Sequence, residues 1–300
     1  MTLATGSPFK HTGELGWAQG YWRLAAWDFS AQETLSFLKG HLDLGVSLVD
    51  HADIYGDYRC EQLFGNALAI QPAIRQQLHV VTKCDIQLIS ASNDVSLNHY
   101  DTSAKHIRSS VERSLARLQT DHIDTLLLHR PDLLMDVDEV VSCFNALRSE
   151  GKVGAFGVSN FSASQFELLN RGFDHQLVTN QVELNPLSFD AFENGAVDHL
   201  QMAGVRPMAW SCLAGGAFFR PQTEQAHRVI ACLSQLATKY DTSLEGVIYA
   251  WVMRHPSRPI VINGSGKIER LASAMAKSQI ILSREDWYRI WVASKGHGVP

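Results

Sequence analysis

Four side chains suited to acid–base chemistry lie at or near the ends of short apolar segments. Asp50, Lys83 and His129 each end a run rich in Val, Ile and Leu, and Tyr55 follows Asp50 by five residues. A phenol has an ordinary pKa of about 10, which a nearby ammonium lowers. We therefore expect Lys83 to make the Tyr55 hydroxyl a usable acid near neutral pH, with Asp50 compensating the burial of the lysine. A neutral His129 would orient a carbonyl oxygen by donating a hydrogen bond.

Each of these residues alone also has an ordinary interpretation. Lys83 could be a solvated side chain after a strand, Asp50 a turn cap, His129 a loop entry and Tyr55 an exposed aromatic. An acid, an ammonium and an imidazole at three successive strand ends, with a phenol nearby, favour a functional interpretation, because four independent coincidences are otherwise needed.

The elements that must position these side chains alternate regularly. Short apolar runs are separated by amphipathic segments, and most runs are continuous, which is typical of parallel strands buried on both faces. The predicted strands are Trp17–Trp22, Val46–Asp50, Leu78–Lys83, Ile123–His129, Val153–Val158, Leu177–Val182, Val205–Trp210 and Pro259–Ile262. Eight such strands, each followed by helical sequence, predict an α/β fold, a (β/α)8 TIM barrel formed by residues 1–300 as a single domain.

The helical segments carry recognisable starts and apolar stripes. Four capping-box patterns begin at Ser30, Asp136, Ser162 and Thr242. Glycines at 45 and 151 stand where a helix should end before the next strand. Two stripes at helical spacing consist of Ile107, Val111, Leu115 and Leu118, and of Val137, Val140, Val141, Phe144 and Leu147.

Two nucleotide-binding alternatives fail on their motifs. An open doubly wound sheet usually has a G-x-G-x-x-G turn after its first strand, and the sequence contains none. The segment Gly264-Ser-Gly-Lys267 resembles a P-loop, but Ile268 follows the lysine and the first glycine of the motif is missing. A barrel is therefore favoured. Because its strand ends converge on one face, the four acid–base side chains should meet there.

Composition excludes several functional classes. A net charge of −5 and the absence of a basic run disfavour nucleic-acid binding. No apolar stretch has the length of a membrane span, and Met1–His11 lacks the core of a signal peptide, so we expect a cytoplasmic protein, monomeric by default. The cysteines form no C-x-x-C pair, which disfavours disulfides and structural zinc; they are Cys60, Cys84, Cys143, Cys212 and Cys232.

Several motifs in the same order are similar to those of one family. They are Gly45-Val-Ser-Leu-Val-Asp50-His-Ala-Asp-Ile-Tyr55-Gly56 continuing to Glu61 and Gly65, Thr82-Lys83, Leu126-Leu-Leu-His129-Arg-Pro-Asp132, Gly151-Lys-Val-Gly-Ala-Phe-Gly-Val-Ser159-Asn160 and Asn180-Gln181-Val-Glu-Leu-Asn185-Pro186. With them, the chain resembles the aldo-keto reductase family, closest to its bacterial YdhF-like oxidoreductase branch. The resemblance runs from about Gly20 to Arg270.

The resemblance implies a role for each matching residue. Asp50, Tyr55, Lys83 and His129 correspond to the catalytic tetrad, and His51 stands where the family commonly has Thr or Ser. NADPH/NADP+ would be the cofactor. The implied cofactor-binding residues are Ser159, Asn160 and Gln181 for the nicotinamide carboxamide, Trp210 stacked on the nicotinamide ring, Ser211, Cys212, Leu213, Gly215 and Gly216 along the pyrophosphate, and Ser265, Lys267 and Arg270 around the adenosine 2′-phosphate.

The implied activity is NADPH-dependent reduction of an aldehyde or ketone to the alcohol, with a small carbonyl compound as the only expected partner. Tyr21 and Trp22 are expected to line the substrate pocket, and the segment Cys84–Asp101 to cover it. A cofactor-sensing or partner-binding barrel remains an alternative. A metal-dependent hydrolase using Asp50, His51, Asp53 and His129 is a further one, although consecutive strand residues face opposite ways and no H-x-H pair occurs; we predict no metal.

Overall fold

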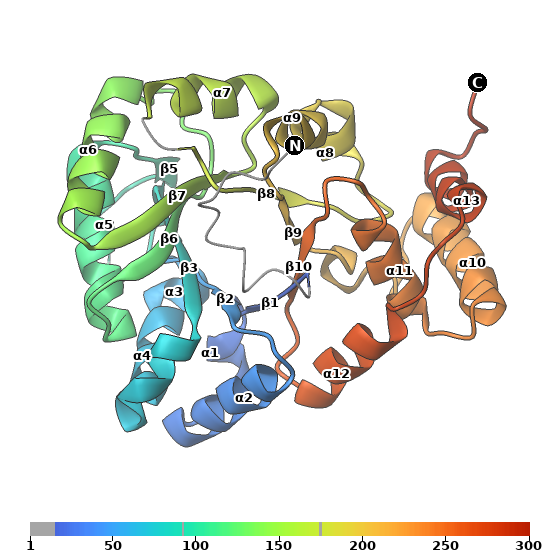
Figure 1. The fold of residues 1–300 in the computed structure, drawn as a ribbon, viewed down its shortest axis with the longest axis horizontal. Helices are drawn as coiled ribbons and strands as arrows, with labels where there is room; N and C mark the ends of the chain where they lie inside the picture. Colours follow the sequence, from blue (N-terminus) through green and yellow to red (C-terminus); the bar gives the residue numbers. More distant parts are fainter. Residues whose placement is uncertain (1–15, 92, 174–175) are drawn as a thin grey trace.

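The strands close into a barrel that is surrounded by helices (Figure 1). The computed structural model describes residues 16–91, 93–173 and 176–300. All eight barrel strands are parallel, in the order β1-β10-β9-β8-β7-β6-β3-β2. Their bounds are β1 Trp17–Gly20, β2 Leu48–Asp50, β3 His79–Cys84, β6 Ile123–Leu128, β7 Val153–Ser159, β8 Asn180–Glu183, β9 Met208–Trp210 and β10 Ile260–Asn263. The predicted fold class is thereby confirmed.

Every predicted strand is present, and the largest differences are at β8 and β9, which each begin three residues later than predicted. The sequence pattern placed strand starts at Leu177 and Val205, whereas β8 begins at Asn180 and β9 at Met208. Leu177 and Val205 are both buried. Because the segments leading into these strands are as buried as the strands, hydrophobicity alone does not mark where the strand starts.

Helices cover the outside of the barrel. They are α1 Leu24–Trp27, α2 Ala31–Asp43, α3 Tyr55–Tyr58, α4 Cys60–Ile70, α5 Ala104–Leu118, α6 Val137–Ser149, α7 Ala163–Gly172, α8 Asp190–Glu193, α9 Ala196–Ala203, α10 Glu224–Lys239, α11 Leu244–Met253, α12 Ile268–Lys277 and α13 Arg284–Lys295, with 3-10 turns at Pro72–Gln77 and Ala214–Gly216. Both predicted apolar stripes pack inward, on α5 and α6. Within the described ranges, no helix combines the length and the apolar character needed to cross a bilayer.

The capping predictions are mostly confirmed. Ser30 and Ser162 form complete capping boxes at α2 and α7. Asp136 accepts two backbone N–H groups at the start of α6. The prediction for Thr242 was wrong by one residue: Ser243 caps α11, while the Thr242 hydroxyl donates to the carbonyl of Lys277.

The barrel interior positions the candidate site directly. A layer of apolar side chains fills the barrel, and includes Leu48, Val81 and Leu127. Side chains two residues apart on a strand share a face. Asp50 and Lys83, each two residues beyond a member of that layer, therefore face inward at the carboxyl ends of β2 and β3. We call this end of the barrel its mouth.

Helices α4 and α5 approach so closely that only glycine fits at position 65. A Cβ at Gly65 would lie 1.9 Å from the carbonyl oxygen of Arg117, a backbone atom that cannot move aside. Alanine favours a helix over glycine by roughly 1 kcal/mol, whereas overpacking costs about 1–3 kcal/mol. Because a 1.9 Å approach to a backbone atom puts the cost at the upper end of that range, we expect Gly65→Ala to lower the free energy of unfolding by about 1–2 kcal/mol in urea denaturation. Gly298→Ala, in open space, is the control; a Gly65→Ala variant as stable as wild type would contradict this packing.

Candidate active site

The Lys83 ammonium contacts three other groups of the site. Its Nζ donates to Asp50 Oδ1 at 2.7 Å, to the carbonyl of His51 at 2.7 Å and to the Tyr55 hydroxyl at 3.1 Å. An ammonium has three hydrogens, so its donors are all used. Lys83 has no exposed surface. A buried charge with every donor satisfied and a carboxylate partner is a stable arrangement, whereas an unpaired one is not.

The pKa of Lys83 is raised above its ordinary value. Burial alone would lower it, but the charge of Asp50 and the bonds to Asp50 and Tyr55 outweigh burial. The lysine is therefore an ammonium at neutral pH. Gln181 reinforces the pair from across the barrel, because its Nε2 donates to the same Asp50 oxygen at 2.8 Å.

The Tyr55 phenol does not become more acidic overall, and on this point the sequence-based expectation was wrong. Burial raises the pKa of Tyr55, and Lys83 lowers it only in part, while Asp50 raises it further. Desolvation disfavours the phenolate more than the neighbouring ammonium favours it. Tyr55 consequently holds its proton throughout the neutral range.

The hydrogen-bond directions show where that proton points. Lys83 has no lone pair, so the Tyr55 oxygen must accept in their contact, and the phenolic hydrogen is left to another acceptor.

The backbone directly after Tyr55 is left-handed at Gly56, Asp57 and Tyr58, with φ of 59°, 56° and 63°. Strained backbone of this kind persists where surrounding structure fixes it, and often lies at functional sites.

His129 is neutral and lies beside Tyr55. The two rings meet edge to face, with centroids 5.9 Å apart. Burial, together with the charges of Lys83 and Arg130, lowers the pKa of His129 well below its ordinary value. Its Nδ1 is buried without a hydrogen-bond partner in the described part of the chain. A neutral imidazole can donate one hydrogen bond to a ligand oxygen.

A second group of polar side chains joins the ends of β7 and β9. The Ser159 hydroxyl donates to the carbonyl of Gln181 at 2.9 Å, and Asn160 Nδ2 donates to that hydroxyl at 2.8 Å. Trp210 Nε1 donates to Asn160 Oδ1 at 3.1 Å. Asn160 Nδ2 also reaches the carbonyl of His129, at 3.4 Å. The structure thus brings these residues together with the tetrad.

The loop after β9 is a tight turn whose main-chain groups are accessible to a ligand. Positive φ angles occur at Ser211 (54°), Ala214 (47°), Gly215 (63°) and Gly216 (102°), and open space surrounds both glycines. The Cys212 thiol is buried and donates to the carbonyl of Ala209, so a ligand at this loop would meet main-chain groups rather than the thiol.

The loop after β10 leads into the N-terminus of α12 with two exposed cations. Lys267 is the N-cap residue of α12, and both Lys267 and Arg270 are exposed. Ser265 is partly exposed, and its Oγ accepts from the Lys267 backbone N–H at 3.2 Å. Cations beside a helix N-terminus suit a phosphate group.

The expected pocket wall is only partly correct. Tyr21 is fully buried, stacks on His51 and bonds to His41 through its hydroxyl, so it belongs to the core outside β2 and not to a pocket. The prediction for Tyr21 was therefore wrong: the large apolar ring is more stable between strand and helix. Trp22 is 60% exposed and remains available at the mouth.

The segment 84–101 forms a small hairpin of β4 Ile86–Gln87 and β5 His99–Tyr100. The Leu88 N–H donates to the Tyr58 hydroxyl at 3.0 Å, and Gln87 Nε2 bonds to His106 on α5. The described part of the hairpin is thereby held against Tyr58 and α5.

The residues of the metal alternative do not converge. Asp50 faces Lys83 inside the barrel. His51 lies outside it, where it stacks on Tyr21 and meets Phe64 edge to face. Over the described ranges, no group of three or more His, Cys, Asp and Glu side chains is placed to hold a metal ion.

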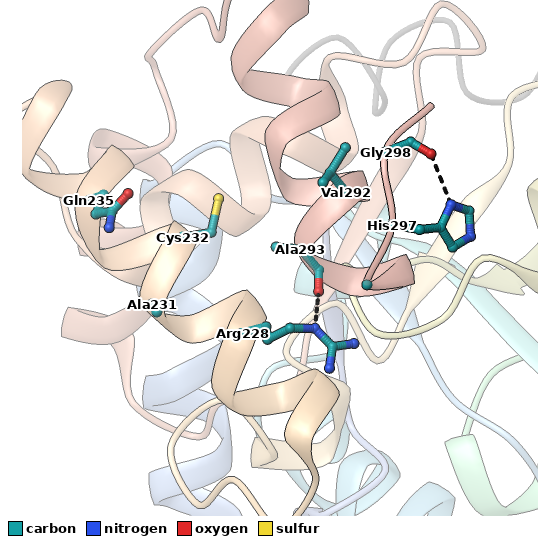
Figure 2. Close-up of a pocket in the computed structure, with 9 residues that line it drawn as sticks. Arg228, Ala231, Cys232, Gln235, Val292, Ala293, His297 and Gly298 are labelled. Carbon is teal, nitrogen blue, oxygen red and sulfur yellow. Dashed lines mark hydrogen bonds between the residues drawn. The ribbon is translucent and has the colours of Figure 1, made fainter. Parts of the chain in front are cut away.

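A hollow elsewhere on the molecule contains none of the predicted site residues. It has a volume of about 550 Å3 and lies between α10 and α13, with Cys232 and His297 in its lining and Arg228 bonded to the carbonyl of Ala293 (Figure 2). The concentration of buried charge and strained backbone at the strand ends places the candidate active site at the mouth instead.

Two charged residues beside the site were not predicted from the sequence. Asp85 follows β3, is buried and accepts the Arg130 backbone N–H through both carboxyl oxygens, at 3.3 and 3.2 Å. Arg130 directly follows His129 and was interpreted only as part of a loop. Its position next to a predicted catalytic residue is the feature that could have singled it out.

Comparison with known protein families identifies the family to which this chain belongs. The aldo/keto reductase family model matches residues 16–294, and the chain belongs to that family. The chain is therefore an oxidoreductase of the aldo/keto reductase class.

Named relatives cover nearly the whole chain. It is 48% identical to oxidoreductase YdhF of Escherichia coli K12, over 94% of both proteins. It is 36% identical to a 6-dehydroglucose reductase of Agrobacterium fabrum, over 93% of this chain and 94% of that protein. A crystal structure of an aldo/keto reductase from Klebsiella pneumoniae, in complex with NADP and acetate, is similar with a TM-score of 0.75 and 25% identity, over 95% of this chain and 92% of that one.

His51 behind the site should make stability depend on pH. Burial, with Lys83 and His41 nearby, lowers the pKa of His51 from 6.5 to about 3. The unfolded chain takes up this proton below pH 6.5 and the folded protein does not, so the contribution is complete above pH 6.5 and is lost as the pH falls toward 3.

We therefore expect His51→Phe, which keeps an aromatic ring against Tyr21, to gain about 2 kcal/mol in unfolding free energy relative to wild type between pH 6.5 and pH 5, measured in urea. His227→Phe on the exposed face of α10 is the control and should show no such change. Parallel pH curves for wild type and His51→Phe would contradict the assignment.

Proposed function

We propose that this protein reduces an aldehyde or ketone to the corresponding alcohol with NADPH, and that Tyr55 is the general acid. The observation that carries the proposal is the direction of one hydrogen bond. Lys83 donates to the Tyr55 oxygen, which leaves the phenolic hydrogen free to bond to a substrate oxygen.

The roles of the residues follow from their charge states. NADPH, when bound, supplies the hydride that is added to the carbonyl carbon. Tyr55 donates its proton to the carbonyl oxygen as negative charge develops there, and neutral His129 orients that oxygen. The raised pKa of Tyr55 keeps the proton in place until then. Lys83, held by Asp50, stabilises the phenolate that remains.

The side chains at the strand ends fit the cofactor. In the left-handed turn at 211–216 the N–H groups of Ala214 and Gly216 bond within the turn, and we assign those of Leu213 and Gly215 to a pyrophosphate. Lys267 and Arg270 offer positive charge to a 2′-phosphate, which favours NADPH over NADH. We assign the nicotinamide to the region of Asn160, Gln181 and Trp210, and the complex of the Klebsiella pneumoniae relative with NADP supports the choice of cofactor.

We further propose that residues 1–300 act as one domain, in the cytoplasm, on a small carbonyl compound. The 6-dehydroglucose reductase similarity supports a carbonyl substrate. The cofactor-sensing barrel that the sequence left open is not retained, because the chain belongs to a family of oxidoreductases and carries Asp50, Tyr55 and Lys83 together at the mouth.

Tyr55→Phe tests the assignment of the acid. Removing the hydroxyl eliminates the proton donor and leaves the ring, so kcat/KM with a panel of aldehydes and ketones should fall by about 10²–10⁴-fold, followed as NADPH consumption. NADPH affinity, measured by fluorescence titration, should stay within a few-fold of wild type because the phenol is not needed to hold the cofactor.

Tyr288→Phe on the exposed face of α13 is the matched control and should keep wild-type activity. Full activity in Tyr55→Phe would exclude Tyr55 as the acid. NADPH binding by wild type without turnover of any carbonyl in the panel would contradict the proposed carbonyl reduction.

A further inference from the structure

Arg130 is anchored at the mouth by its main chain. Both carboxyl oxygens of buried Asp85 accept its N–H, so the backbone directly after His129 is fixed. The Arg130 side chain is partly exposed. Its position is therefore determined by the same strand end that presents His129.

The guanidinium of Arg130 extends over the barrel mouth. It lies 5.9 Å from the centroid of the Trp210 ring, a distance typical of a cation–π contact. Arg130 follows β6 and Trp210 ends β9, and these strands are separated in the barrel by β7 and β8 (Figure 1). A side chain that connects these two strand ends lies at the mouth, where Asn160 bonds to Trp210 and to the carbonyl of His129.

Within the described ranges, this guanidinium forms no ion pair. Arg75, Arg108 and other arginines bond to carboxylates, whereas no carboxylate of the described residues lies within ion-pair distance of Arg130. Glu183 is close enough for the charge of Arg130 to lower its pKa slightly against the dominant effect of burial, but its Oε1 accepts from Asn185 at 2.9 Å instead. A partly buried guanidinium without an anionic partner, in an active-site mouth, is suited to bind an anion.

We propose that Arg130 determines substrate specificity by binding an acidic group on the carbonyl substrate, of the carboxylate, sulfonate or phosphate class. This proposal rests on the proposed function, since Tyr55 and His129 would hold the carbonyl while Arg130 holds the anionic end. The same chemistry could bind a phosphate of the cofactor, but the turn at 211–216 and the pair Lys267 and Arg270 already offer donors to those phosphates. The substrate is therefore the source we assign.

The test compares two substrates that differ only in charge, 4-carboxybenzaldehyde and methyl 4-formylbenzoate. Wild type should prefer the carboxylate in kcat/KM with NADPH. Because a charge-assisted hydrogen bond would be lost, Arg130→Met should lower the carboxylate-to-ester ratio about 10–100-fold. Arg130→Lys should give an intermediate ratio, since a lysine keeps the charge without the planar pair of donors.

Arg284→Met is the matched control, because it removes an equal charge from an exposed position at the start of α13 and should leave the ratio unchanged. An unchanged ratio in Arg130→Met overturns the proposal, including the case in which both substrates lose activity equally. An unchanged ratio with NADPH affinity weakened about tenfold would assign Arg130 to the cofactor and also overturns it.

Calorimetry on the NADP+-loaded protein separates this proposal from the proposed function. If wild type turns over neither aldehyde, the proposed activity on such carbonyls fails. The binding preference for the carboxylate over the ester, and its loss in Arg130→Met, would still support Arg130 as the anion-binding residue. Equal binding of both compounds by wild type would overturn it.

Discussion

The structure depends on an ion pair that is withdrawn from water. A lysine and an aspartate in a barrel interior would each lose several kcal/mol of hydration, and that loss is offset only with close contact and full hydrogen bonding. Lys83 and Asp50 meet both conditions: the ammonium uses its three hydrogens, and the carboxylate accepts from Lys83 and Gln181. Such a pair also needs backbone segments that stay close together. Asp50 and Lys83 lie on β2 and β3, which are adjacent, hydrogen-bonded parallel strands.

The rest of the site follows from this constraint. With Lys83 fixed as a donor, the Tyr55 oxygen is fixed as an acceptor, and the charge of Lys83 helps to keep His129 neutral. An acid that keeps its proton and a neutral hydrogen-bond donor are what a carbonyl oxygen requires as it gains negative charge. Family membership assigns the chain to a class whose chemistry this arrangement fits.

The sequence predicted the strands well, because parallel strands buried on both faces leave continuous apolar runs, and the ends of those runs indicated which side chains meet at the mouth. It could not predict properties that depend on the sum of several opposing contacts in the folded protein. Tyr21 was assigned to the pocket, yet its ring is held in the core by His51 and His41. Whether the pKa of Tyr55 is raised or lowered depends on how burial and the charge of Asp50 balance the charge of Lys83. The importance of Arg130 depends on the position of its guanidinium beside Trp210 and on the distance to the nearest carboxylates.

The most direct measurement of the central claim is the rate of hydride transfer in a single turnover with saturating NADPH, in wild type and in Lys83→Met. The methionine keeps an unbranched side chain, one atom shorter than that of lysine, and removes its charge. If the ammonium is needed to stabilise the phenolate of Tyr55, the rate at pH 7 falls by about 10²–10⁴-fold while NADPH affinity stays within a few-fold. Hydride transfer at close to the wild-type rate in a folded Lys83→Met protein would contradict the account.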